Sequence, residues 1–320
     1  MICHVNKIRY LFVLTIFLLC SCQSDVAGDP SPPGTGPGSS RLSELLRDDT
    51  TDQFPKAVAA REFRFPRDHA AHEEFRNEWW YFTGNLDDPD GRRFGYELTV
   101  FRFSLTPEVP TSLPSEWQTN QVYVGHFAIT DVAGEQFHVA QRYSRGSLGL
   151  AGASELPIRV WMDDWSIEVD DSGERWVLTA NDEAIGIELE LTAAKPVVLN
   201  GERGLSQKSA TPGNASYYYA IPRLDTVGTV RVQETTFDVT GQSWLDREWG
   251  SSALARDQRG WDWFALQLSD GSDLMFYTIR KNDGQADEYS SGTYTDATGR
   301  VTPLGQSEVR IQVLDTWDSA

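Results

Sequence analysis

The chain has 320 residues, which fits two domains of ordinary size, and 40% of them are hydrophobic. Acidic residues outnumber basic ones by 47 to 28, so the formal net charge is −19. This balance argues against nucleic-acid binding, which needs a basic stripe, and against electrostatic docking on an anionic membrane surface. The three cysteines, Cys3, Cys20 and Cys22, all lie near the N-terminus, so a disulfide framework is excluded for the folded part.

Residues 1–21 have the pattern of a signal peptide, with Lys7 and Arg9 ahead of an apolar run that is too short to span a membrane stably. A Leu and then a small residue precede Cys22, which is the lipobox pattern of bacterial lipoproteins. We therefore expect Cys22 to be the lipidated N-terminus of the mature chain. Ordinary signal-peptidase cleavage nearby is the alternative.

Residues 22–50 are expected to hold the lipidated cysteine, a flexible tether and a short helix. Residues 25–40 are rich in Pro, Gly and Ser and will not pack, whereas residues 41–48 carry leucines at helical spacing. The lipid anchor is the expected contact with a membrane. No Asp follows Cys22 to indicate inner-membrane retention, so the expected location is the outer membrane, facing the periplasm or the surface.

After residue 54 the pattern changes to short strands separated by turns. Residues 78–86 and 94–103 are β-prone and flank an Asp- and Gly-containing turn, which predicts a hairpin. Many short antiparallel strands with close spacing predict an all-β barrel or sandwich. Further strands are expected at 122–130, 136–143, 158–161, 166–169, 176–180, 185–191, 216–223 and 227–239.

The chain contains an internal echo. The pattern W-x-[YW]-F-x-x-x-L occurs at residues 79–86 and again at 261–268, each time before a Gly-containing turn and a second apolar strand. The repeat predicts two similar β domains, at residues 51–225 and 226–320. The second has too few expected strands to close a barrel, so it is either open or C-terminally incomplete, although a strand is expected at 308–314.

The stretch 241–263 is the strongest candidate site, because it combines four Trp residues with acidic residues that have apolar neighbours in the sequence. In an extended chain Trp244, Asp246 and Glu248 share one face. Two carboxylates among indoles can have a raised pKa through desolvation and like-charge repulsion. The alternative is structural: Arg247 pairs with an acid and the Trp side chains form a core. The opposite face takes Leu245, Arg247 and Trp249.

Other titratable residues carry weaker signals. Glu97 lies in an aromatic strand, where it is either a paired or functional acid in a barrel interior or a solvated acid outside. His126 is expected to point into a barrel, as a core or catalytic side chain. His69 and His72 have a polar neighbourhood and are expected to be exposed, so no metal site is predicted. No G-x-S-x-G elbow and no phosphate-binding loop occurs.

Several motifs resemble the AttH/CrtC family, which includes bacterial carotenoid 1,2-hydratases. They are NEWWYFTGNL, FGYELTVFRF, KPVVLNGERGLSQK, SYYYAIPR, GQSWLDREWG and GWDWFALQLSDGSDLMFY, and the resemblance covers about residues 65–317. It implies two lipocalin-like antiparallel β-barrel domains, the second without the family's usual final strands. It also implies water addition to a C=C bond of an elongated polyprenoid or lipid, with no redox cofactor.

Hydration needs an acid, groups that stabilise a tertiary cation, and a water. Asp246 and Glu248 are the expected catalytic acids. Hydratases of the family tend to carry His where this chain has Arg247, which cannot shuttle protons and counts against hydratase activity. A non-catalytic lipid carrier or chaperone is therefore the alternative, and an ester hydrolase a weaker one. The expected ligand-binding residues are Trp80, Tyr81, Glu97, His126, Trp244, Arg247, Trp249, Trp261 and Trp263.

Overall fold

A computed structural model describes residues 53–108, 115–252 and 254–316. The expected signal peptide, Cys22 and the tether with its short helix lie outside these residues. Within them, no helix has both the length and the hydrophobicity needed to cross a bilayer.

The described chain is built almost entirely of antiparallel strands, as predicted. Two single-turn 3-10 helices, η2 (Arg67–His69) and η3 (Gln306–Glu308), accompany them. The strands are β1 (Asn77–Asp87), β2 (Arg93–Ser104), β3 (Gln121–Asp131), β4 (Gln136–Arg145), β5 (Ala151–Glu155), β6 (Ile158–Met162), β7 (Trp165–Val169), β8 (Arg175–Asn181), β9 (Ile185–Ala193), β10 (Val198–Leu199), β11 (Leu205–Gln207), β12 (Ala215–Val232), β13 (Thr235–Gly250), β14 (Gln258–Gln267), β15 (Asp273–Lys281), β16 (Ser291–Thr295) and β17 (Val301–Gly305).

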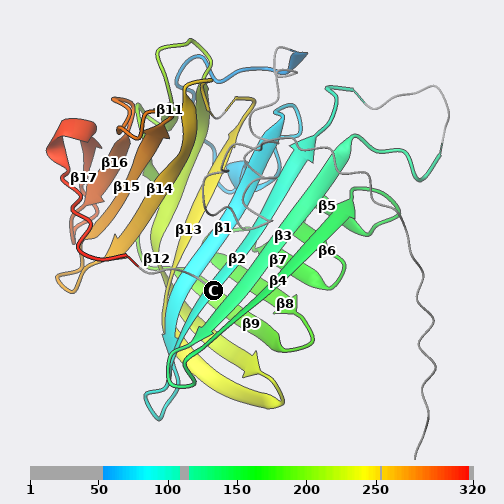
Figure 1. Cartoon of the computed structure of the whole chain (residues 1–320). Helices are drawn as coiled ribbons and strands as arrows, with labels where there is room; N and C mark the ends of the chain where they lie inside the picture. Colours follow the sequence, from blue (N-terminus) through cyan, green and yellow to red (C-terminus); the bar gives the residue numbers. More distant parts are fainter. Residues whose placement is uncertain (1–52, 109–114, 253, 317–320) are drawn as a thin grey trace, which may run out of the picture.

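The larger sheet has the order β4-β3-β2-β1-β13-β12-β9-β8-β7-β6-β5, with β10 and β11 also paired to β12. It curls until its two ends approach each other, as in a lipocalin-like barrel (Figure 1). Ring contacts cross the interior between strands that are distant in this order: Phe127 meets Trp165 at 5.7 Å, and Phe82 meets Trp176 at 5.4 Å. The interior is therefore a packed aromatic core.

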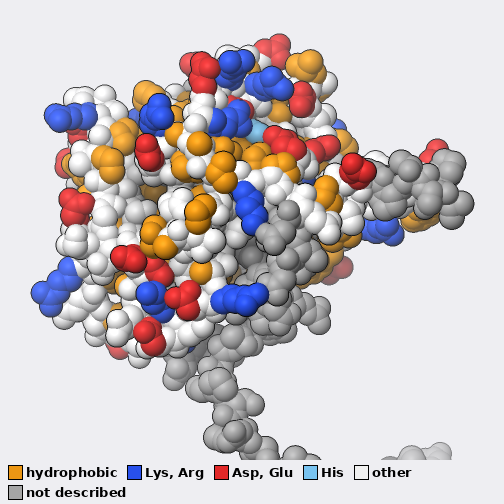
Figure 2. Space-filling view, turned by 90° about the horizontal axis from the view of Figure 1, so that it is seen from above, with side chains coloured by type: hydrophobic (Ala, Val, Ile, Leu, Met, Phe, Trp, Pro, Cys, Tyr) orange, Lys and Arg blue, Asp and Glu red, His pale blue; other side chains and the backbone are white. Residues whose placement is uncertain are grey.

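The segment before β1 crosses one end of this barrel and closes it. Phe63 packs against Trp249, with ring centroids 5.6 Å apart, and the carbonyl of His69 accepts a 3.0 Å hydrogen bond from the Trp80 indole. His69 and His72 are 1% and 7% exposed, so the expectation of two exposed histidines is wrong. In the view from above, hydrophobic side chains gather in the upper middle of the face, with charged side chains both among and around them (Figure 2).

The second sheet, β14-β15-β16-β17, packs against the outer face of the larger one (Figure 1). Its central apolar contacts join Trp244 to Met275 and Tyr277. A buried ion cluster holds the two sheets together at one side. Asp273 of β15 accepts hydrogen bonds from Arg223 at 2.8 Å and from Lys195 at 2.5 Å.

Strand β12 runs across the expected domain boundary at 225/226. The pair Asp225-Thr226 has a turn-like composition, but Thr226 is buried and its hydroxyl lies 2.7 Å from that of Ser243, so the strand continues. The turn comes at Gln233, which has φ 53°, and β13 then returns in the larger sheet. The prediction of a strand at 308–314 is wrong, because the described chain has no regular secondary structure after η3.

Candidate functional site

Strand β13 presents Trp244, Asp246 and Glu248 on its outer face, so the predicted alternation is confirmed. Antiparallel pairing with β1 places Tyr81 opposite Asp246 and Trp79 opposite Glu248. Because paired residues of neighbouring strands point to the same side, two acids and two aromatic rings meet on one patch of the sheet.

The second sheet supplies the facing wall. Trp261 and Trp263 of β14 lie opposite the patch, and the ring centroids of Tyr81 and Trp263 are 5.2 Å apart at 71°. Trp79 and Tyr81 are the positions that the sequence echo matched to Trp261 and Trp263. The two copies of the pattern therefore line one space from opposite sides.

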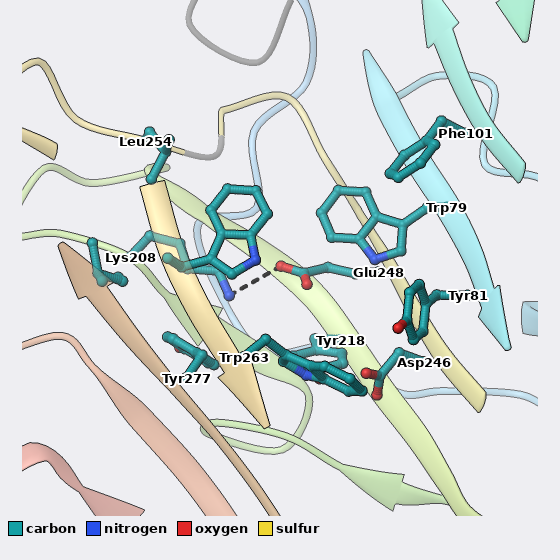
Figure 3. A pocket seen from close by; sticks show the side chains of 12 residues that line it. Trp79, Tyr81, Phe101, Lys208, Tyr218, Asp246, Glu248, Leu254, Trp263 and Tyr277 are labelled. Carbon is teal, nitrogen blue, oxygen red and sulfur yellow. Dashed lines mark hydrogen bonds and ion pairs between the residues drawn. The ribbon is translucent and has the colours of Figure 1, made fainter. Parts of the chain in front are cut away.

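Between the sheets lies a cavity of about 220 Å³ (Figure 3). Its walls are mainly aromatic, with the acids grouped on β13. The lining residues are Trp79, Tyr81, Phe101, Lys208, Tyr218, Asp246, Glu248, Leu254, Trp261, Trp263, Tyr277 and Ile279.

Asp246 is 4% exposed and lies against the rings of Tyr218 and Trp263 (Figure 3). Burial raises the pKa of Asp246 to about 7, and the neighbouring Glu248 adds to the rise. Hydrogen bonds to the carboxyl group from the Trp244 indole, at 3.1 Å, and from Tyr218 oppose the rise only in part. Asp246 is therefore a carboxyl group that holds and releases a proton near neutral pH.

Glu248 has a different environment, because a cation lies beside it. The ammonium of Lys208 is 3.0 Å from the Glu248 carboxylate and 4.2 Å from the ring centroid of Tyr277. Ser216 also donates a hydrogen bond to Glu248. Burial opposes the charge of Lys208, but Glu248 and Tyr277 together outweigh it and raise the pKa of this lysine. The cavity thus places a carboxyl group of raised pKa beside an ion pair.

Glu97 and His126 lie on the same outer face, one and two strands beyond Tyr81. Register places Thr99 between Tyr81 and His126. Glu97 is on the exterior of the sheet but half-buried; burial raises its pKa to about 7, although the hydroxyl of Thr99 donates to it. His126 does not point into the barrel, and burial lowers its pKa. Neither residue lines the cavity itself.

Trp80, Arg247 and Trp249 do not line the cavity, because alternate residues of a strand point to opposite faces. All three lie in the barrel interior, fully buried. The guanidinium of Arg247 is 3.9 Å from the ring centroid of Trp80 and donates a 3.0 Å hydrogen bond to Glu78. Arg247 therefore has the structural role considered as the alternative, since it pairs with a buried acid in the core. The acids of the same strand face the cavity instead.

Sequence patterns missed several lining residues. Trp79 and Phe101 could have been found from the hairpin register once Asp246 was placed opposite Tyr81. Tyr218 and Tyr277 had no such signal, since each looks like an ordinary strand aromatic. The sequence marks Lys208 only as a candidate for a buried cation, and nothing in its spacing predicts the pairing with Glu248. Among the described residues, no group of three or more His, Cys, Asp or Glu side chains is arranged to hold a metal ion.

The fold and the cavity define the class: an all-β, lipocalin-like protein that holds two acids in an aromatic-walled space between its sheets. The chain belongs to the AttH-like family, which it matches over residues 56–320. The family resemblance predicted from the motifs is thereby confirmed.

Solved structures agree with this assignment. A protein of Nitrosomonas europaea described as an AttH is 32% identical, with a TM-score of 0.75 over 83% of this chain and 80% of that one. Kievitone hydratase of Nectria haematococca is 12% identical, with a TM-score of 0.56 over 79% and 71% of the two chains, and this likeness shows the fold alone. Comparison with curated proteins gave no match.

Proposed function

We propose that the cavity binds one end of an elongated apolar molecule, a polyprenoid or lipid, and adds water across a C=C bond by acid catalysis. The observation that carries the proposal is the carboxyl group of Asp246, buried among aromatic rings with a pKa of about 7. A hydratase among proteins of this fold supports the reaction class. No redox cofactor is required by this chemistry.

In the proposed reaction, the Asp246 carboxyl group donates its proton to the less substituted alkene carbon. The electron pair of the π bond forms the new C–H bond and leaves a tertiary cation on the other carbon. The faces of Trp79, Tyr81 and Trp263 stabilise that charge. Water attacks the cation, and the resulting oxonium ion loses a proton to the Asp246 carboxylate, which regenerates the acid.

Glu248 and Lys208 have a positioning role in this proposal. The ammonium group of Lys208 fixes the position of the Glu248 side chain, whose oxygen accepts a hydrogen bond from the attacking water. The carboxylate also adds to the pKa of Asp246, so it keeps the neighbouring acid protonated. In this proposal Asp246 supplies the acid, the aromatic rings stabilise the cation, and Glu248 orients the water.

The cavity size bears on the substrate. Its volume of about 220 Å³ is below the range of about 300–1,000 Å³ that encloses whole drug-sized ligands. A long molecule therefore inserts only one end, and its remainder lies outside. This fits a reaction at a terminal double bond.

The first test is to incubate the protein with farnesol or geranylgeraniol as substrate, in water labelled with heavy oxygen. We expect a product that carries one labelled hydroxyl group, detected by mass spectrometry. Asp246→Asn should lower the rate by about a thousandfold, because an amide cannot protonate an alkene. Asp238→Asn, an exposed acid on the same strand, should leave the rate unchanged. If the double variant Asp246→Asn, Glu248→Gln still forms product at the wild-type rate, this chemistry is excluded.

A non-catalytic carrier is the second candidate. The cavity is mainly apolar, and Glu248 is already engaged in an ion pair with Lys208, as expected for a structural acid. Native mass spectrometry followed by solvent extraction separates the two. Retained apolar ligand that Trp263→Ala releases, with no product from any probe, would favour the carrier. Labelled product would favour the enzyme.

We also propose that the protein is an outer-membrane lipoprotein anchored through Cys22. The support is the sequence of the export segment alone. Cells grown with radioactive palmitate should label the chain, and Cys22→Ser should remove the label. Equal labelling of the wild type and the variant would contradict the anchor.

A further inference from the structure

Strand β4 forms one edge of the larger sheet and exposes large hydrophobic side chains on its outer face. Phe137, Val139 and Tyr143 are 68%, 66% and 59% exposed, at alternate positions of the strand. Leu148 and Leu150 follow directly and are also exposed. A group of exposed apolar residues concentrated on one strand and the segment after it points to an interaction surface.

The same segment is free of acids. Residues 136–154 contain no Asp or Glu, in a chain that has 47 of them. They do contain Arg142 and Arg145; Arg142 pairs with Asp164, whereas Arg145 is exposed and has no carboxylate partner among the described residues. The segment itself is therefore basic, unlike the chain as a whole, and the neighbouring Asp131 and Asp164 are each paired with an arginine. Charges farther than about 10 Å away are screened at ordinary salt.

Apolar side chains connect this strand to the cavity. Register on the outer face aligns Tyr143 with Val124, Val124 with Phe101, and Phe101 with Trp79. Neighbouring strands are about 4.8 Å apart, so the row is continuous. Phe101 and Trp79 already line the cavity.

We propose that β4 and the segment after it, residues 136–150, rest on an anionic lipid bilayer. Exposed aromatic and aliphatic side chains enter the interface, and Arg145 meets the lipid headgroups. A second copy of this chain fits less well, because two acid-free, basic strands would meet without a carboxylate between them. In this position the row from Tyr143 to Trp79 leads from the bilayer surface to the cavity.

Hydrogen–deuterium exchange of the full chain tests the docking, with vesicles of phosphatidylcholine and about 30% phosphatidylglycerol. As an edge strand, β4 has outward amides without sheet partners, which exchange fast in solution. We expect vesicles to slow exchange of residues 136–150 about tenfold or more. An N-terminal lipid anchor alone would leave these amides exchanging as before, so the two attachments are distinguishable.

Variants sharpen the test. Phe137→Ser with Tyr143→Ser, and separately Arg145→Glu, should each reduce the protection by vesicles about tenfold. Val227→Ser, which is 51% exposed on β12, and Arg310→Glu, also exposed, should leave it unchanged.

Protection that spares residues 136–150, or that all variants share, would overturn the proposal. Protection without vesicles that grows with protein concentration would assign the strand to a second copy and overturn it as well. The measurement needs no substrate, so its outcome does not depend on whether Asp246 performs chemistry.

Discussion

Asp246→Asn is expected to stabilise the protein at about pH 8, by about 4 kcal/mol in the free energy of unfolding. Burial raises the pKa of this carboxyl group from 3.8 to about 7. Above that value the folded protein must hold a buried, ionised Asp246 beside Glu248. An amide avoids this cost and can still accept the hydrogen bond from Trp244.

The pH dependence follows from the sign of the shift. A group whose pKa is raised by folding contributes most below its unfolded value, here 3.8, and loses that contribution as pH rises to about 7. Denaturant titrations at about pH 5 and about pH 8 should therefore show a smaller loss of stability in Asp246→Asn than in the wild type. Asp238→Asn, exposed on the same strand, should follow the wild type. Equal losses in all three proteins would mean that Asp246 titrates normally.

Glu78→Gln is expected to destabilise the protein by about 3–5 kcal/mol. Glu78 is fully buried and binds two arginines that are also fully buried: Arg102 donates to one of its oxygens, and Arg247 lies 3.0 Å from the other. Burial alone would raise the pKa of Glu78, but Arg102, a hydrogen bond with His72, and Arg247 together hold it well below its usual range. Gln leaves both positive charges in the core without a counter-charge.

The matched control is Glu190→Gln, which breaks an exposed pair with Arg175 and should change stability by less than about 1 kcal/mol. The contribution of Glu78 is complete above its ordinary pKa of 4.5 and is lost as pH falls below that value. Chemical denaturation at neutral pH and in acid measures both effects. A difference between the variants that does not shrink in acid would show that the charge of Glu78 is unimportant.

Local pattern was enough for much of this structure. The alternation around Asp246 correctly separated the residues of β13 that face the cavity from those in the core. The repeated pattern at residues 79–86 and 261–268 begins a hairpin each time, as expected from the sequence, and aromatic side chains of both copies line the cavity. Both signals come from side chains within one strand or hairpin, where spacing in the sequence fixes direction in space.

Long-range placement could not be predicted in the same way. Lys208 meets Glu248 because β11 and β13 flank the same strand, β12, which sequence spacing does not specify. The turn composition of Asp225-Thr226 was misleading, because β12 pairs there with β13 on one side and β9 on the other, and this pairing outweighs local preference. Trp80 and Tyr81 were both expected to contact ligand, but neighbours on one strand take opposite faces.

The ion cluster around Asp273 has a consequence for affinity. The cavity exists only while the second sheet is packed against the first. Lys195 and Arg223 stabilise this packing through Asp273, although neither residue lines the cavity. Ligand binding and sheet docking are therefore linked equilibria: a bound molecule favours the docked arrangement, and loosening of the cluster weakens binding. The affinity of the proposed site would then depend on residues that do not touch the ligand.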